Sequence, residues 1–258
     1  MHPSPGRRPP GRNRVQGAII LQKQERIWEL DALRGLCILC VIIVHFLFDL
    51  VYFAGLDVSF PPVYVFIQQY GGVIFVVLSG CCATLGSRSF RRGATVFGCG
   101  MLISAVTAGM YFLGMAARDV IVWFGVLHLL GVCMMLYPVY KKLPAEALAC
   151  IGVVLVVAGY LLAGTTVEAK FLFPLGLCYP GFASSDYFPL LPHLGWYMLG
   201  TVFGAAVYAE KKTRLPGKAK SWAVTRFFCF CGRQSLWIYL IHQPVVFGLL
   251  QRVLLMIK

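Results

Sequence analysis

The sequence contains few charged residues. Asp, Glu, Lys and Arg make up only 13% of its 258 residues, against about 25% in a typical soluble domain, whereas 59% of the residues are hydrophobic. This composition excludes an ordinary soluble domain and predicts an integral membrane protein. Acidic residues are especially scarce, so the formal net charge is +13. The basic residues lie between apolar runs and form no face interleaved with aromatic residues, which argues against a nucleic-acid partner.

Several catalytic motifs are also missing. The sequence has no P-loop, no Gly-rich nucleotide fingerprint after a strand, no G-x-S-x-G elbow and no H-E-x-x-H. Phosphoryl transfer, hydride transfer and zinc proteolysis therefore have no support. Ten cysteines are present, but most lie in or beside apolar runs, and the Cys81/Cys82 and Cys229/Cys231 pairs lack the spacing of a zinc site. We expect neither disulfides nor a metal.

Long apolar runs are abundant. Residues 1–25 are rich in Pro, Gly and Arg and lack the apolar segment of a signal peptide, so we expect a disordered basic cytosolic tail. For residues 26–258 we expect one all-α membrane domain, a bundle of about seven transmembrane helices. The expected spans are 32–55, 62–86, 94–114, 120–140, 145–164, 187–209 and 235–257. Segment 171–180 is shorter and contains two prolines, so we expect it in a loop or re-entrant piece.

Basic residues are unevenly divided between the two sets of gaps. Most of the 23 Lys and Arg residues lie in the tail and in the gaps after the second, fourth and sixth runs. The positive-inside rule therefore predicts a cytosolic N-terminus and an external C-terminus. Glycines in the second and sixth runs predict close approach of those helices, at Gly71, Gly72, Gly80, Gly200 and Gly204.

The first apolar run, with the residue before it, carries four ionisable residues, Asp31, Arg34, His45 and Asp49. At about 100° per residue they share one face of a helix, which should face the protein interior. Ionisable groups inside a membrane are costly and mark functional sites. His45 suits a general base or nucleophile, and Asp49 could orient its ring or cap the helix end. Arg34 could bind a phosphate or pair with Asp31.

Other polar residues in or beside the runs are weaker candidates, because packing or interfacial hydrogen bonding explains them about equally well. As substrate-binding candidates we take His128, His193, Trp196, His242 and Gln243. The cluster Arg88, Arg91 and Arg92 serves either as a positive-inside anchor or as a site for a phosphorylated cofactor.

Four segments of the sequence resemble one known family. In chain order they are RIWELDALRGLCILCVIIVHFLFDL, WFGVLHLLGV, DYFPLLPHLGWYMLGTVFG and GRQSLWIYLIHQPVV. Over residues 26–251 they resemble the bacterial members of the heparan-α-glucosaminide N-acetyltransferase catalytic-domain-like family. The spacing of Arg34 and His45, with ten residues between them, is similar to the first-helix pattern of the wider transmembrane acyltransferase superfamily. That superfamily includes the acyltransferase type 3 proteins. Lysosomal members carry an amide at the position of His45, so the heparan substrate is not transferred to this chain.

The resemblance implies a single transmembrane acyltransferase domain at residues 26–258 in the plasma (inner) membrane. Such a domain transfers an acetyl group from cytosolic acetyl-CoA to a glycan or sugar acceptor on the far side. His45 matches the family's catalytic histidine and Arg34 its paired arginine. Arg34, Arg88, Arg91 and Arg92 are then the candidates for binding the phosphates of acetyl-CoA.

Other functions remain open from the sequence. One alternative is a proton-coupled transporter or flippase of a lipid-linked or anionic solute, with the first-run charges as a proton relay. Another is a non-catalytic subunit of an envelope-modifying complex. Membrane lipids surround the protein in every case. The sequence leaves open the acceptor, the choice between oxygen and nitrogen acylation, and the oligomeric state, a homodimer included.

Overall fold

The structure, a computed structural model, describes residues 26–54 and 59–257 and is all-α in that part of the chain. The tail expected at residues 1–25 lies outside the described residues. Each apolar run contains a helix, and one further helix, α7, lies between the last two runs. The helices are α1 (Trp28–Ala54), α2 (Pro62–Leu85), α3 (Ser89–Phe112), α4 (Val126–Tyr140), α5 (Ala145–Leu161), α6 (Leu190–Val207), α7 (Ala223–Arg233) and α8 (Ser235–Ile257).

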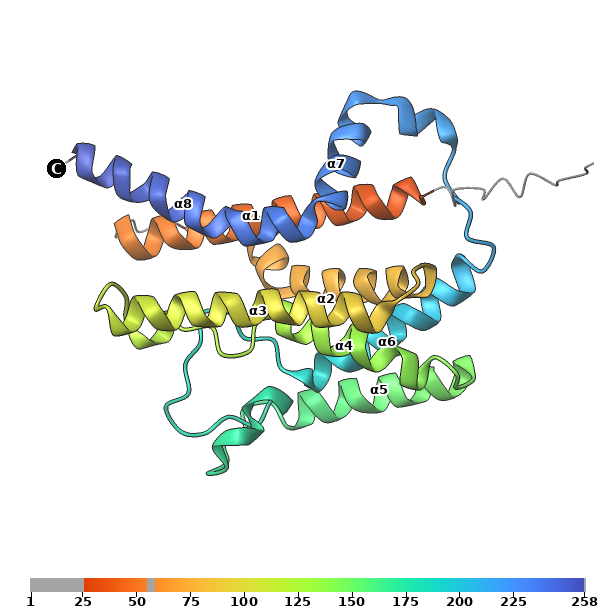
Figure 1. Ribbon diagram of the computed structural model, residues 1–258, viewed down its shortest axis with the longest axis horizontal. Helices are drawn as coiled ribbons and strands as arrows, with labels where there is room; N and C mark the ends of the chain where they lie inside the picture. The colour runs from red at the N-terminus through yellow and green to blue at the C-terminus, as the bar shows by residue number, and fades with distance from the viewer. Residues whose placement is uncertain (1–25, 55–58, 258) are drawn as a thin grey trace, which may run out of the picture.

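The helices pack in pairs. The most extensive contacts join α3 with α4, α2 with α6, α5 with α6, and α1 with α7. α8 lies along α1 and runs in the same direction (Figure 1). The start of α1 and the α2–α3, α4–α5 and α6–α7 connections gather at one end of the molecule, on the right of Figure 1. The basic gaps of the sequence are therefore brought to a common end.

Local sequence explains several helix starts. Proline stands immediately before α2, α5 and α6, at Pro61, Pro144 and Pro189. A proline is tolerated there because its missing N–H would have no partner within the helix. Between these starts, the apolar runs bury side chains such as Val76, Leu129 and Tyr197 in a core formed by α2, α4 and α6.

Among the described residues, four helices are long and apolar enough to cross a membrane: α1 over Trp28–Val51, α2, α3 and α6. α4 and α5 are apolar but have only 15 and 17 residues. At about 1.5 Å per residue they are shorter than a hydrocarbon core of about 30 Å. The structure therefore supports a membrane protein with four candidate spans, fewer than the seven expected from the apolar runs.

Two helices begin later than the sequence predicts. α4 begins at Val126 and not at residue 120, and α6 begins at Leu190 and not at residue 187. The preceding segments pair with each other instead, since the Phe188 N–H donates to the Phe124 carbonyl at 2.9 Å. A short 3₁₀ turn, η1 (Arg118–Val120), also precedes α4. Segment 171–180 contains no spanning helix, and most of the 3₁₀ turn η2 (Lys170–Leu175) falls within it.

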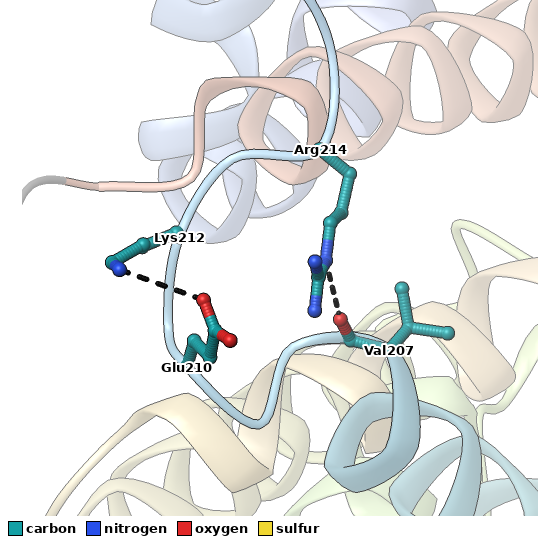
Figure 2. Close-up of polar contacts among 4 residues, drawn as sticks. All are labelled: Val207, Glu210, Lys212 and Arg214. Carbon is teal, nitrogen blue, oxygen red and sulfur yellow. Dashed lines mark hydrogen bonds and ion pairs between the residues drawn. The ribbon is translucent and has the colours of Figure 1, made fainter.

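The basic segment after α6 connects two distant helices. The Arg214 Nε donates to the Val207 carbonyl at the end of α6, at 2.8 Å (Figure 2). The Arg214 backbone N–H donates to the buried carboxylate of Glu29 in the first turn of α1, at 2.7 Å. Lys212 and Glu210 form an exposed ion pair at 3.5 Å, which contributes little to stability (Figure 2). The segment thus joins the end of α6 to the start of α1.

α7 is the helix that the apolar runs did not predict. It has 11 residues, too few to span a membrane, and a short 3₁₀ turn, η3 (Gly217–Ser221), precedes it. α7 packs against α1 through glycine on both sides. A Cβ at Gly35 would overlap the Phe228 carbonyl, and a Cβ at Gly232 would overlap the Asp31 carbonyl. This contact fixes the end of α7, and hence the start of α8, against the first turns of α1.

The glycines of α2 and α6 behave largely as the sequence predicts. A Cβ at Gly80 or Gly200 would overlap a carbonyl of the facing helix, and a Cβ at Gly204 would lie 2.7 Å from one. Gly72 instead faces an aromatic ring, and Gly71 lies near a side chain of its own helix. The close approach of α2 and α6 therefore depends on three of the five predicted glycines.

Two glycines of α3 test this dependence on small residues. A Cβ at Gly93 would lie 2.7 Å from the Gly131 carbonyl of α4, whereas a Cβ at Gly98 would have no neighbour within 4 Å. We expect Gly93→Ala to destabilise the protein by about 1–3 kcal/mol through overpacking, and Gly98→Ala to have little effect. Thermal unfolding in detergent measures both. Equal melting temperatures for the two variants would contradict this account of the α3–α4 contact.

Candidate functional site

The polar face of α1 meets α8. The Arg34 Nη2 donates to the Ser235 hydroxyl at 2.9 Å, which links the first turns of the two helices. Further along, the rings of His45 and His242 are in edge-to-face contact, with their centroids 5.2 Å apart. The face that the helical period assigns to Arg34 and His45 is therefore turned toward α8.

Asp49 extends this contact. Its side chain is buried, with 2% exposure, and its carboxylate accepts a hydrogen bond from the Gln243 side-chain amide at 2.9 Å. Gln243 follows His242 directly, so Asp49 anchors the segment of α8 that carries the second imidazole. The Gln243 carbonyl oxygen is buried without a hydrogen-bond partner. Asp49 thus lies close to the histidine pair and contacts α8.

The ring of His242 has a defined orientation. Its Nδ1 lies 2.6 Å from the Tyr239 carbonyl, which can only accept, so Nδ1 carries the proton. In the neutral ring Nε2 is then an acceptor, and this atom is buried without a partner. His242 therefore offers a free lone pair, on a ring that contacts the ring of His45.

Tyr239 connects the histidine pair to the rest of the bundle. Its hydroxyl donates to the Asp186 carboxylate at 3.0 Å, and the Val126 N–H at the start of α4 donates to the same oxygen at 3.1 Å. Burial raises the pKa of the Asp186 carboxyl, while these two hydrogen bonds act in the opposite direction. Asp186 thus holds α8 against the start of α4.

A cavity of about 720 Å³ opens beside Arg34. We call it the arginine cavity, because Arg26, Arg34, Arg92 and Arg233 all line it, together with Asp31. These side chains come from the start of α1, from α3 and from the end of α7. The Arg34 Nε is buried without a hydrogen-bond partner. The cavity therefore combines an excess of positive charge with an unsatisfied donor.

The remaining lining of the arginine cavity is largely apolar. Phe75, Leu127, Leu130 and Met134 contribute to it from α2 and α4. Along α8 the lining runs from Ser235 to Tyr239, about 6 Å deeper at 1.5 Å per residue. Tyr239 contacts His242, with ring centroids 5.2 Å apart. One residue thus separates the cavity from the histidine pair.

Of the arginine cluster at the start of α3, the structure brings only Arg92 to this cavity. Arg88 has a left-handed backbone conformation immediately before α3. All three arginines are exposed, so exposure does not distinguish them. The Arg92 guanidinium lies against Gly86, where a Cβ would approach Nη1 to 2.6 Å. Arg91 and Arg92 are neighbours on α3 and point in directions about 100° apart, whereas Arg88 precedes the helix, so only one of the three lines the cavity.

His128 is engaged in a separate network. Its Nδ1 accepts from the Gly125 N–H at 3.2 Å, and its Nε2 lies 3.3 Å from the Ser104 hydroxyl, which donates to the Val122 carbonyl. The ring is buried against Phe97. Both nitrogens are therefore used to fix the start of α4 against α3.

His193 and Trp196 lie in the first turns of α6. The His193 Nδ1 lies 2.8 Å from the Pro189 carbonyl, and its ring packs on Phe188. Trp196 packs against the core between α2, α4 and α6, and its Nε1 is buried without a partner. In the part of the chain that the structure describes, both residues have contacts of their own, whereas His45 contacts the ring of His242.

Sequence reasoning missed several residues of the site. His242 was among the candidates, but Ser235 and Tyr239 were not. The three recur at spacings of four and three, so one face of α8 carried a detectable signal. Arg26 and Arg233 were interpreted only as topology signals, and nothing in their local sequence distinguishes them from the other basic residues. Their role at the cavity depends on the packing of α7 against α1.

The site contains groups suited to group transfer. Two imidazoles in contact can serve as base and acid, and guanidinium groups bind phosphate oxygens strongly. Within the described part of the chain, no three His, Cys, Asp or Glu residues are grouped so as to hold a metal ion. The arrangement therefore places a cavity lined by four arginines beside two imidazoles in contact.

Comparison with protein families identifies the family of the chain. The family model that matches residues 26–244 is described as "Heparan-alpha-glucosaminide N-acetyltransferase, catalytic". No curated protein and no solved structure matches the chain. The match covers most of the chain and includes α1, the arginine cavity and the histidine pair. The protein therefore belongs to the heparan-α-glucosaminide N-acetyltransferase catalytic-domain family.

Proposed function

We propose that this protein transfers an acetyl group from cytosolic acetyl-CoA to a glycan or sugar acceptor on the far side of the plasma membrane. Family membership implies transferase activity at a membrane. The single observation that carries the finer proposal is the connection of the arginine cavity, through Tyr239, to the His45–His242 pair.

The arginine cavity fits the donor in chemistry and size. Coenzyme A carries several phosphate groups at one end and a long, slender pantetheine arm at the other. Arg26, Arg34, Arg92 and Arg233 can bind the phosphates, while the apolar lining suits the arm. The volume of about 720 Å³ lies within the range of about 300–1,000 Å³ that is typical of ligand sites. Bound in this way, the thioester extends past Tyr239 toward His242.

The histidine pair supplies the proton transfer. In the direct route His45 takes the proton of an acceptor O–H or N–H as that atom attacks the thioester carbonyl. The C–S bond breaks, a C–O or C–N bond forms, and the proton passes to the CoA thiolate. In the two-step route a ring nitrogen of His45 attacks the thioester carbonyl and the C–S bond breaks, which releases the CoA thiolate. The acceptor then attacks the acetyl-histidine, the C–N bond to His45 breaks, and the acceptor's proton passes to the imidazole. In both routes the free Nε2 of His242 can accept a hydrogen bond from His45 and so orient its ring.

The arrangement of the chain supports a cytosolic entry for the donor. The connections at the α1 start carry most of the basic residues, which by the positive-inside rule belong in the cytosol. Arg34 lies on the same end, and His45 follows about 16 Å further along α1. We propose that α4, α5 and α8 complete the membrane domain alongside the four candidate spans, with an external C-terminus.

Replacement of His45 tests the chemical role directly. We expect His45→Ala to lower acetyl transfer by about 10²–10⁴-fold, because general acid or base catalysis typically contributes that much. The measurement is transfer of a labelled acetyl group from acetyl-CoA to a glycan acceptor by the purified protein in vesicles. Ile43→Ala is the control, since this side chain is 55% exposed on the same helix.

The same assay separates the competing functions. An active His45→Ala variant that folds normally would refute the role of His45. Proton-coupled uptake of a solute without release of CoA would favour the transporter over the enzyme. Release of CoA that requires both acetyl-CoA and an acceptor would support the transferase.

Two adjacent residues of α3 test the donor site. Arg92 lines the arginine cavity, whereas Arg91 does not. We expect Arg92→Gln to raise the KM for acetyl-CoA by about tenfold through loss of a charge-assisted contact, and Arg91→Gln to leave it unchanged. S-Acetylpantetheine, which lacks the phosphates, should be used equally by all three proteins. Equal KM values of the two variants for acetyl-CoA would exclude this cavity as the phosphate site.

A further inference from the structure

A second cavity lies between the start of α1 and α7. Its volume is about 800 Å³, and we call it the α7 cavity. Four basic side chains line it, with Asp31 as the acidic residue of the lining. The basic residues are Arg26, Lys220, Arg226 and Arg233. The excess of positive charge indicates a site for an anion.

Trp28 lines the same cavity and carries an unsatisfied buried donor. Trp28 is 9% exposed, and its indole N–H has no hydrogen-bond partner. An indole nitrogen is a donor only, so the group that satisfies it must be an acceptor. A buried donor without a partner is uncommon in folded proteins. Charge and hydrogen bonding therefore both point to a ligand with oxygen acceptors and negative charge.

The α7 cavity also has an apolar side. Phe227 and Phe230 line it and remain 54% and 55% exposed. Trp222 and Val224, at the start of the same helix, are exposed by 66% and 65%. A short helix that combines exposed aromatic side chains with Lys and Arg is typical of the membrane interface. An inorganic anion would not require this apolar surface, whereas a lipid would.

The position of the cavity agrees with such a ligand. The candidate span of α1 begins at Trp28, so the α7 cavity lies where that helix enters the membrane. Tryptophan is enriched at this depth, where one side of its ring is apolar and its N–H reaches polar groups. Basic side chains at the cytosolic surface attract anionic lipids.

We propose that the α7 cavity binds the phosphate headgroup of an anionic membrane lipid. Lys220 and Arg226 contact the phosphate together with the Trp28 N–H, and the acyl chains lie along Phe227 and Phe230. This site is distinct from the arginine cavity, although Arg26, Asp31 and Arg233 line both. The proposal does not depend on the acetyl-transfer reaction.

The test uses residues that line the α7 cavity alone. The full chain is purified in neutral detergent and titrated with phosphatidylglycerol or phosphatidylcholine, and binding is followed by native mass spectrometry. We expect the protein to prefer phosphatidylglycerol, and Lys220→Gln/Arg226→Gln to weaken that binding by about tenfold or more. Lys141→Gln/Lys142→Gln removes the same charge from an exposed loop at the same end and should have no effect.

Two further measurements identify the group that is bound. Trp28→Phe keeps an aromatic ring but removes the donor, and we expect about threefold weaker binding of phosphatidylglycerol. Inorganic phosphate and CoA at millimolar concentration should not displace the lipid. Equal binding of the two lipids, or unchanged binding by the Lys220/Arg226 variant, would refute the site. Displacement by CoA, with weaker CoA binding in that variant, would assign the cavity to the donor.

Discussion

The contact between one polar face of α1 and one polar face of α8 determines most of the site. Polar groups inside a membrane cost several kcal/mol when they lack partners, so an apolar helix that carries Arg34, His45 and Asp49 must find them on another helix. α8 supplies a partner at each level, with Ser235, His242 and Gln243. Since these contacts lie along about 22 Å of α1, they fix the direction and the register of α8 together.

That register also places the two cavities. α7 ends at Arg233 and α8 begins at Ser235, so the contact of Arg34 with Ser235 and the packing of Gly35 on α7 constrain each other. A side chain at Gly35 or Gly232 would push α7 away from α1. The basic residues at the end of α7 would then leave the start of α1. Small residues in one helix contact thus control the charge around both cavities.

The sequence predicts the parts of this structure that depend on local chain properties. Apolar length predicts the helices, and the helical period predicts the shared face of α1. The predicted starts of α4 and α6 were wrong, because segments far apart in the chain, around Phe124 and Phe188, pair with each other. α7 was missed because it is short and bordered by charge. Similarly, the choice of Arg92 over Arg88 and Arg91 depends on the direction in which α3 faces its neighbours, which the sequence alone does not give.

The unpartnered polar atoms carry the argument one step further. Among the described residues, seven side chains contain a buried nitrogen or oxygen without a hydrogen-bond partner. Four of them, Trp28, Arg34, His242 and Gln243, belong to α1 and α8. Folded proteins leave few such atoms unsatisfied. These two helices pair Arg34, His45 and Asp49 with side chains of α8 and still retain free donors and acceptors, which is the arrangement expected of a surface completed by a ligand.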